Sequence, residues 1–87
     1  MPLELEIKDY LRQLLEQRAL KKKIPVAGIT EEANLMDLGV LDSIAFFEII
    51  TAIEVKFCLE VSFSDVVPGA FSTLAGISAQ CARGKRA

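Results

Sequence analysis

The Asp42-Ser43 pair is the most prominent candidate for chemistry in this chain. It stands where a long loop meets the most hydrophobic predicted helix, and both residue types are favourable helix N-caps. Free backbone N–H groups and the positive end of the helix dipole make such a helix end favourable for a phosphate. The Ser43 hydroxyl is therefore suited to carry a phosphodiester. A purely structural interpretation, in which Asp42 or Ser43 only caps the helix, explains the same two residues.

The chain lacks the catalytic groups that usually activate a serine such as Ser43. The chain has no histidine, so it holds neither a Ser-His nor a Cys-His nucleophile pair. No lysine is placed by local spacing to act as a base, and the common glycine-rich phosphate and nucleotide motifs are absent. Cys58 and Cys81 lack metal-ligand spacing, and each is expected to be a small buried side chain. A small hydrolase or transferase is the least favoured hypothesis, and no metal site is expected.

Two long helices are expected to position the pair. Apolar side chains at helical spacing predict a first helix from about Leu3 to Leu20. The second helix is predicted to start at Asp42 or Ser43 and to end near Phe57, with two distinct stripes. The predicted core stripe consists of Phe46, Ile50, Ile53 and Phe57. The predicted solvent stripe consists of Ser43, Phe47, Thr51 and Glu54.

The remaining elements complete an all-α fold with three main helices and one short helix. A last helix is predicted after Ser72, an N-cap candidate, and before Gly84, with Leu74, Ile77 and Cys81 inward. A short segment at Ser64–Val67 precedes it, and no clear strand is expected. The predicted core consists of Ile7, Leu11, Leu14, Phe46, Ile50, Ile53, Phe57, Leu74 and Ile77.

The connection over residues 24–42 is predicted to be a long loop between the first two main helices. A loop of this length is often functional in a compact domain. Its apolar residues suggest that it is pinned to the core: Ile24, Val26, Ile29, Leu35, Leu38 and Leu41. The chain of 87 residues is interpreted as one domain over residues 1–83, with a basic C-terminal tail at 84–87.

The charge is unevenly distributed. Residues 30–82 carry eight acids against Lys56 alone, whereas the segments before and after are net basic. This acidic middle disfavours nucleic acid and favours a partner with a basic surface. No apolar run approaches the length of a membrane helix, and the N-terminus is acidic where a signal peptide is basic. We expect a soluble, cytoplasmic monomer without membrane insertion.

The wider pattern around Asp42-Ser43-Ile44 resembles the acyl carrier protein family over roughly residues 3–83. Acids stand 5 and 11 residues after the serine (Glu48 and Glu54), and a phenylalanine stands 14 residues after it, as in that family. The segment Leu59-Glu60-Val61 then resembles the one that closes the family's second helix. The loop just before the serine is most similar to the branch that includes D-alanyl carriers. The stretch at 71–76 looks like the start of the last helix in peptidyl carrier domains of nonribosomal synthetases.

The resemblance implies an acyl-carrier-like four-helix bundle that catalyses no reaction. It implies that Ser43 bears a covalent 4′-phosphopantetheine, whose thiol holds an acyl or aminoacyl group as a thioester. It also implies that Asp42 helps a phosphopantetheinyl transferase and its magnesium to approach the serine. Further implied partners are an acyl- or aminoacyl-loading ligase or synthetase and a downstream acyltransferase or synthase. The expected docking residues are Ile44, Phe47, Glu48, Thr51 and Glu54.

Some residues depart from the family pattern. Ile44 replaces the usual leucine, and Cys58 stands where many carriers have glycine; a left-handed conformation there costs a non-glycine residue ~1 kcal/mol. Ala45, Val55 and Lys56 occupy places where fatty-acid carriers tend to have acids. These places point to a specialised pathway of fatty acid, polyketide or nonribosomal peptide type. The carried group stays open, and a helical interaction module without a prosthetic group is the alternative function.

Overall fold

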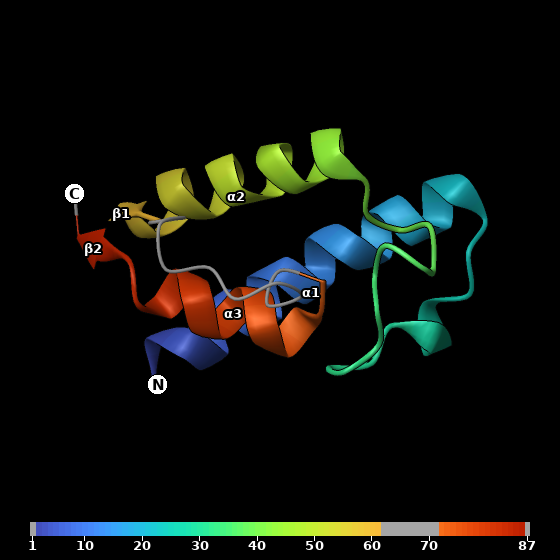
Figure 1. Cartoon of the computed structure of the whole chain (residues 1–87), viewed down its shortest axis with the longest axis horizontal. Coiled ribbons are helices and arrows are strands. Elements are labelled where there is room, and N and C mark those ends of the chain that lie inside the picture. The colour runs from blue at the N-terminus through green and yellow to red at the C-terminus, as the bar shows by residue number, and fades with distance from the viewer. Residues whose placement is uncertain (1, 62–71, 87) are drawn as a thin grey trace.

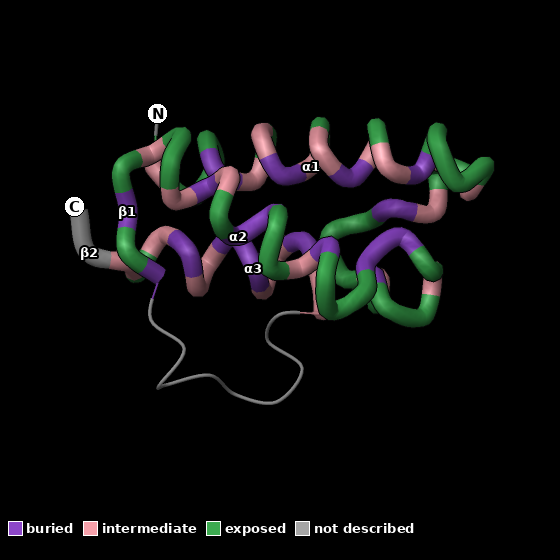
Figure 2. The backbone as a smooth tube through the Cα atoms, turned by 90° about the horizontal axis from the view of Figure 1, so that it is seen from above, coloured by how far each residue is buried: buried purple, intermediate pink, exposed green. Residues whose placement is uncertain are grey.

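The protein is mainly helical. The structure, a computed structural model, describes residues 2–61 and 72–86. Its elements are α1 (Leu3–Lys22), the 3-10 helix η1 (Val26–Gly28), α2 (Ser43–Phe57), β1 (Leu59–Glu60), α3 (Leu74–Ala82) and β2 (Lys85–Arg86). Figure 2 shows α2 and α3 on the same side of α1, and Figure 1 shows them apart from each other, so each of them packs against α1. The all-α prediction is confirmed at this level, and the helix predicted at Ser64–Val67 lies outside the described residues.

Helix α1 runs two residues beyond its predicted end. Acidic side chains occupy its first turn and lysines its last turn, as the helix dipole favours. Lys23 then takes a left-handed conformation with φ 59° and ends the helix before Pro25. The buried face, which Figure 2 shows turned toward α2 and α3, consists of Ile7, Leu11, Leu15 and Ala19. The predicted core residue Leu14 is only partly buried, at the edge of this face.

Helix α2 has the predicted bounds, but its buried face is rotated relative to the prediction. The buried side chains are Ala45, Ile49, Ile50 and Ile53. Phe46 and Phe57, predicted in the core stripe, are partly buried and pack at its edges. Ten of the fifteen positions of α2 are apolar and they surround most of the helix, so the spacing of hydrophobic residues did not determine which side faces the core.

Helix α3 carries the predicted inward residues, but its cap differs by one position. Leu74, Ile77 and Cys81 are buried, as predicted. The N-cap is Thr73, whose Oγ1 accepts a hydrogen bond from the Gly76 N–H at 3.0 Å, and not Ser72. Both residue types cap helices well, and the sequence could not distinguish two neighbouring candidates.

The segment between α1 and α2 contains η1 and turns, and it is attached to the core. The predicted anchors Ile29, Leu35 and Leu41 are buried, as is Val40. Ile24, Val26 and Leu38 are partly buried against the same core. Backbone hydrogen bonds also join the segment to the start of α3, from Leu35 N to Ser72 O and from Ala75 N to Glu31 O. The segment that leads to Ser43 is therefore part of the packed structure, as its apolar residues predict.

A short antiparallel pairing joins the end of α2 to the C-terminal residues. Leu59 lies opposite Arg86, and Glu60 lies opposite Lys85, two residues that the sequence assigns to a basic tail. A side chain at Gly84 would bring its Cβ to 2.7 Å from the Glu60 backbone oxygen, so glycine permits this close approach. The expectation of no strand is wrong here, because a two-residue pairing leaves no periodicity in the sequence.

Candidate functional site

Ser43 is the first residue of α2, and its side chain is exposed. The residue before it, Asp42, is in an extended conformation, and its Oδ1 accepts a hydrogen bond from the Ala45 N–H at 2.7 Å. Asp42 is therefore the N-cap, which decides between the two candidates at this helix end. Among the residues that the structure describes, none forms a hydrogen bond with the Ser43 hydroxyl. A hydroxyl thus lies exposed at a helix N-terminus without serving as the cap.

The Asp42 carboxylate is held in its ionised form by its surroundings. The hydrogen bond from the Ala45 N–H lowers the pKa of Asp42, and the nearby cations Lys22 and Arg18 lower it further. Lys22 Nζ lies 3.9 Å from Asp42 Oδ2. A negative charge at the start of α2 also suits the helix dipole. The side chain beside Ser43 is accordingly a fixed, charged cap at neutral pH.

The residues just before the site are fixed to α1 by two side-chain donors. Arg18 Nε donates to the Val40 backbone oxygen at 3.2 Å, and Lys22 Nζ donates to the Gly39 backbone oxygen at 3.3 Å. Gly39 has a φ of +78°, a left-handed conformation that glycine adopts without strain. Next to it, Val40 and Leu41 are buried. Sequence reasoning missed both donors, because they are 22 and 17 residues from their partners.

Four of the five expected docking residues lie on the exposed side of α2. Ile44 is 72% exposed and Phe47 60% exposed, and Glu48 and Thr51 are also exposed. Phe47 contacts the neighbouring Phe46 ring edge to face, with ring centroids 5.4 Å apart. Phe47 is therefore exposed, as its place in the predicted solvent stripe requires.

Glu54 does not belong to the exposed stripe. Its side chain is partly buried, and its Oε2 accepts a hydrogen bond from the Val61 N–H at 3.0 Å, just past β1. The prediction that Glu54 faces solvent is wrong, because a backbone donor from the following segment turns the carboxylate inward. Sequence reasoning did not include Val55 among the expected docking residues, although this side chain is 75% exposed. We use the name α2 outer stripe for Ile44, Phe47, Thr51 and Val55, which lie at helical spacing along one side of α2.

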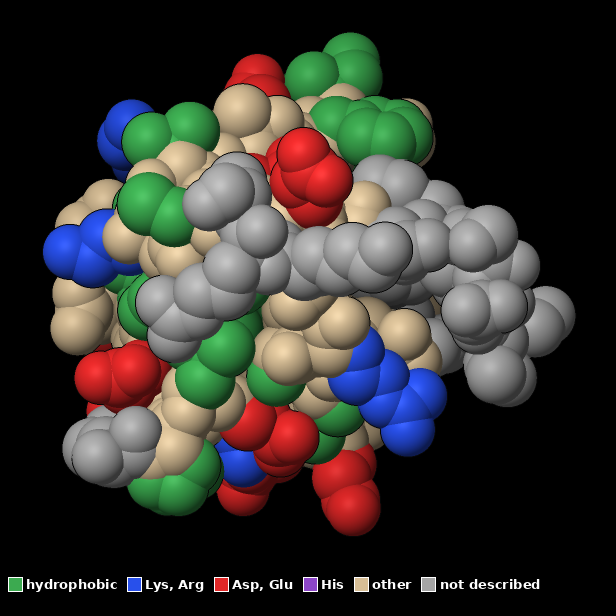
Figure 3. All heavy atoms as spheres, turned by 90° about the vertical axis from the view of Figure 1, so that its left-hand side faces the viewer, with side chains coloured by type: hydrophobic (Ala, Val, Ile, Leu, Met, Phe, Trp, Pro, Cys, Tyr) green, Lys and Arg blue, Asp and Glu red, His purple; other side chains and the backbone are tan. Residues whose placement is uncertain are grey.

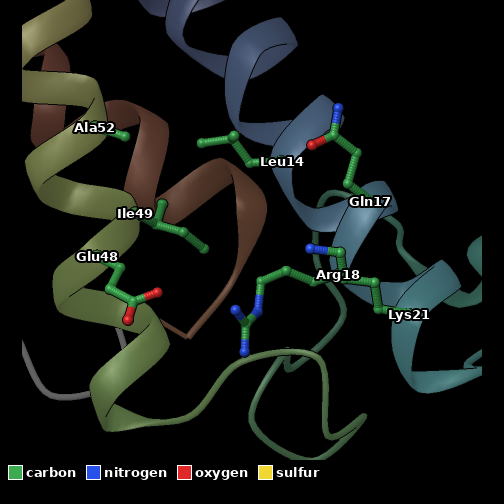
Figure 4. Close-up of a pocket in the computed structure, with 7 residues that line it drawn as sticks. All are labelled: Leu14, Gln17, Arg18, Lys21, Glu48, Ile49 and Ala52. Atoms are coloured by element: carbon green, nitrogen blue, oxygen red, sulfur yellow. The ribbon is translucent and has the colours of Figure 1, made fainter.

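A shallow groove of about 240 Å³ lies between α1 and α2, near the site (Figure 4). Leu14 on α1 and Ile49 on α2 point into it from opposite sides, while Arg18 extends from α1 toward the segment that leads into α2. Its lining residues are Leu14, Gln17, Arg18, Lys21, Glu48, Ile49 and Ala52. The groove begins roughly one to two helical turns from Ser43 along α2.

The surface at the end of the molecule that carries β1 and β2 is mixed in character. Figure 3 views the end of the molecule that carries β1 and β2, away from Ser43, where charged and hydrophobic side chains are interspersed. Over residues 2–61 and 72–86, no cluster of three or more potential ligands could hold a metal ion. In the same part of the chain, no helix is long and apolar enough to cross a membrane.

The two cysteines differ in environment. Cys81 is buried as predicted, and burial, reinforced by the Glu54 carboxylate, raises the pKa of its thiol to about 12. Cys58 is exposed, which contradicts the prediction of a buried side chain, because it is the C-cap of α2 and lies outside the buried face of the helix. Neither cysteine lies beside Ser43 in the sequence.

The comparison with protein families identifies the class to which this site belongs. A family model described as a phosphopantetheine attachment site matches residues 9–81, which is most of the chain. The chain belongs to this phosphopantetheine-binding carrier family, whose domain is the site of covalent 4′-phosphopantetheine attachment. Carrier domains of this kind are generally non-catalytic. Because the family model describes the attachment of a prosthetic group, the match does not favour an interaction module without one. No curated protein and no solved structure matches the chain.

Proposed function

We propose that Ser43 is the residue that receives 4′-phosphopantetheine, and that the chain is a carrier of acyl or aminoacyl groups. The observation that supports this assignment best is the exposed Ser43 hydroxyl in the first turn of α2, directly after a cap supplied by Asp42. The family match covers this position. The proposal includes the four-helix bundle of carrier proteins, with a long loop before Ser43.

The residues around Ser43 fit a covalently bound phosphodiester. The backbone N–H groups of the first turn of α2 are oriented toward an anion at the helix end. Asp42 occupies the Ala45 N–H, and its own negative charge is offset by Lys22 at 3.9 Å. When it is bound, the prosthetic group supplies a thiol that holds the carried group as a thioester. The chain's own residues hold the attachment point and leave it open to solvent.

The proposed carrier catalyses no reaction and depends on partner enzymes. We infer that a phosphopantetheinyl transferase attaches the arm, and that Asp42 helps this transferase and its magnesium to approach Ser43. The other inferred partners are an acyl- or aminoacyl-loading ligase or synthetase and a downstream acyltransferase or synthase. The α2 outer stripe is the proposed docking surface, with Glu48 beside it. Its exposed part is apolar at Ile44, Phe47 and Val55, as expected of a surface that binds a protein partner. We propose that these partners belong to a specialised fatty acid, polyketide or nonribosomal peptide type pathway. The monomeric state expected from the sequence stays a prediction.

The assignment is tested by incubating the protein with a phosphopantetheinyl transferase and coenzyme A, followed by intact-mass spectrometry. The parent chain is expected to gain one arm, and Ser43→Ala is expected to gain none while it keeps the helical content of the parent. Thr30→Ala is the matched control, because Thr30 also carries an exposed side chain but lies far from α2 in the sequence. An arm on Ser43→Ala, or no arm on the parent, would overturn the proposal.

A further inference from the structure

We propose that Arg18 and Lys22, both on α1, are positioning residues that fix the backbone before Ser43 for modification by the transferase. The inference rests on the proposed function of Ser43. It concerns side chains that are 25 and 21 positions away from this serine in the sequence. Neither residue is part of the Asp42-Ser43-Ile44 motif.

The two residues lie on one face of α1 and bind the same backbone segment before Ser43. They are four positions apart, so their side chains emerge side by side, one turn from each other. Arg18 donates to the Val40 oxygen at 3.2 Å and Lys22 donates to the Gly39 oxygen at 3.3 Å. Side chains of one helix thus bind two consecutive backbone carbonyls, those of Gly39 and Val40. Figure 4 shows the Arg18 side chain crossing the gap from α1 toward this segment.

Lys22 also links the Gly39 carbonyl to Asp42, the N-cap of α2. Its Nζ lies 3.9 Å from Asp42 Oδ2, while Asp42 Oδ1 accepts the hydrogen bond from the Ala45 N–H at 2.7 Å. A single lysine therefore contacts the loop carbonyl three residues before Asp42 and the capping carboxylate itself. Ser43 directly follows Asp42 and begins α2, so the position of its backbone at the helix start depends on this connection.

Apolar packing alone does not explain the arrangement. Val40 and Leu41 are buried and anchor the segment to the core. However, the Lys22 contact with Gly39 is exposed, and an exposed hydrogen bond adds little to overall stability. Its main effect is local, because it restricts a glycine with φ +78° that otherwise has many accessible conformations. Small displacements of a reacting group reduce rates steeply, by up to about 100-fold for 1 Å.

The inference predicts a kinetic defect without a loss of fold. Arg18→Ala and Lys22→Ala are each expected to lower kcat/KM for attachment of the arm roughly tenfold, mainly through kcat. In hydrogen exchange on the unmodified chain, the Ala45 and Phe46 amides of these variants are expected to exchange faster than in the parent. Lys22→Arg keeps the charge and the donor, and it is expected to restore both values close to the parent's.

Lys23→Ala is the matched control for charge. Lys23 is also a lysine at the end of α1, and in the described part of the chain its side chain forms no hydrogen bond or ion pair. It is expected to have the parental rate of attachment and parental amide exchange. Lys22→Ala changes an exposed residue, so it serves as the second variant if Arg18→Ala does not fold.

The experiment separates this inference from the proposed function. Attachment of the arm to Ser43 in the parent, together with slowed attachment and faster exchange only in Arg18→Ala and Lys22→Ala, supports both. Parental rates and exchange in both variants would overturn the positioning role and leave the function of Ser43 intact. An equal loss of rate in Lys23→Ala would also overturn it, because the effect would then come from charge in general. A parent chain that is not modified at Ser43 would overturn both proposals.

Discussion

Replacement of Cys58 by glycine is expected to stabilise the protein. Cys58 is the C-cap of α2 and has φ 54° and ψ 53°, a left-handed conformation. A residue with a Cβ in this region carries a penalty of about 1–2 kcal/mol, which glycine avoids. Glycine in turn increases the conformational entropy of the unfolded chain, which costs about 0.4–1 kcal/mol. Because Cys58 is exposed, little packing is lost, and the net gain is about 0.5–1 kcal/mol.

The assay is thermal and urea unfolding of the parent, Cys58→Gly and Cys58→Ala under reducing conditions. A gain of this size corresponds to a rise in Tm of about 2–8 °C for a domain of this length. Cys58→Ala removes the same thiol but keeps a Cβ at the left-handed position, so its Tm is expected to stay near the parent's. If Cys58→Gly is no more stable than Cys58→Ala, the backbone conformation of this cap contributes no strain and the reasoning is refuted.

Three further predictions follow from the described contacts. Phe57→Ala is expected to lower the free energy of unfolding by about 2–3 kcal/mol, because its ring is only partly buried and packs edge on against Tyr10 at 5.8 Å; unchanged urea unfolding would contradict this packing. Phe47→Ala is expected to weaken transferase binding more than Glu48→Lys at high salt, measured by calorimetry, since an apolar anchor resists screening and an exposed charge does not; the reverse order would make docking electrostatic. The pKa of Asp42 is lowered in the folded state, so the stability difference between parent and Asp42→Ala is expected to be complete above the ordinary carboxyl pKa of 3.8 and to shrink as pH falls below it, in urea unfolding at a series of pH values; a pH-independent difference would contradict it.

The start of α2 was predictable because its signals are local. The side chain of a capping residue contacts a backbone N–H only three positions ahead, so Asp42 and Ser43 mark the helix start in the sequence itself. A left-handed conformation at Cys58 was raised only as a condition, from the resemblance of this position to one that holds glycine in related carriers, and the structure shows it with φ 54°. Features that depend on two or three neighbouring residues could thus be located without the structure.

The parts that could not be predicted depend on distant partners. Glu54 lies on a helical position that faces solvent by spacing alone, but its carboxylate accepts the Val61 N–H from the next segment. Arg18 and Lys22 look like ordinary charges at the end of a helix until the fold brings Gly39 and Val40 beside them. Side-chain types alone do not specify such contacts.

The central claim is that this chain carries 4′-phosphopantetheine on Ser43. The most direct measurement is tandem mass spectrometry of peptides from the protein after reaction with a phosphopantetheinyl transferase and coenzyme A. We predict that the arm is found on Ser43 alone, on the peptide that contains Asp42-Ser43-Ile44. An arm located on any other residue would contradict the account. So would a Ser43 that stays unmodified after prolonged reaction with an active transferase and coenzyme A.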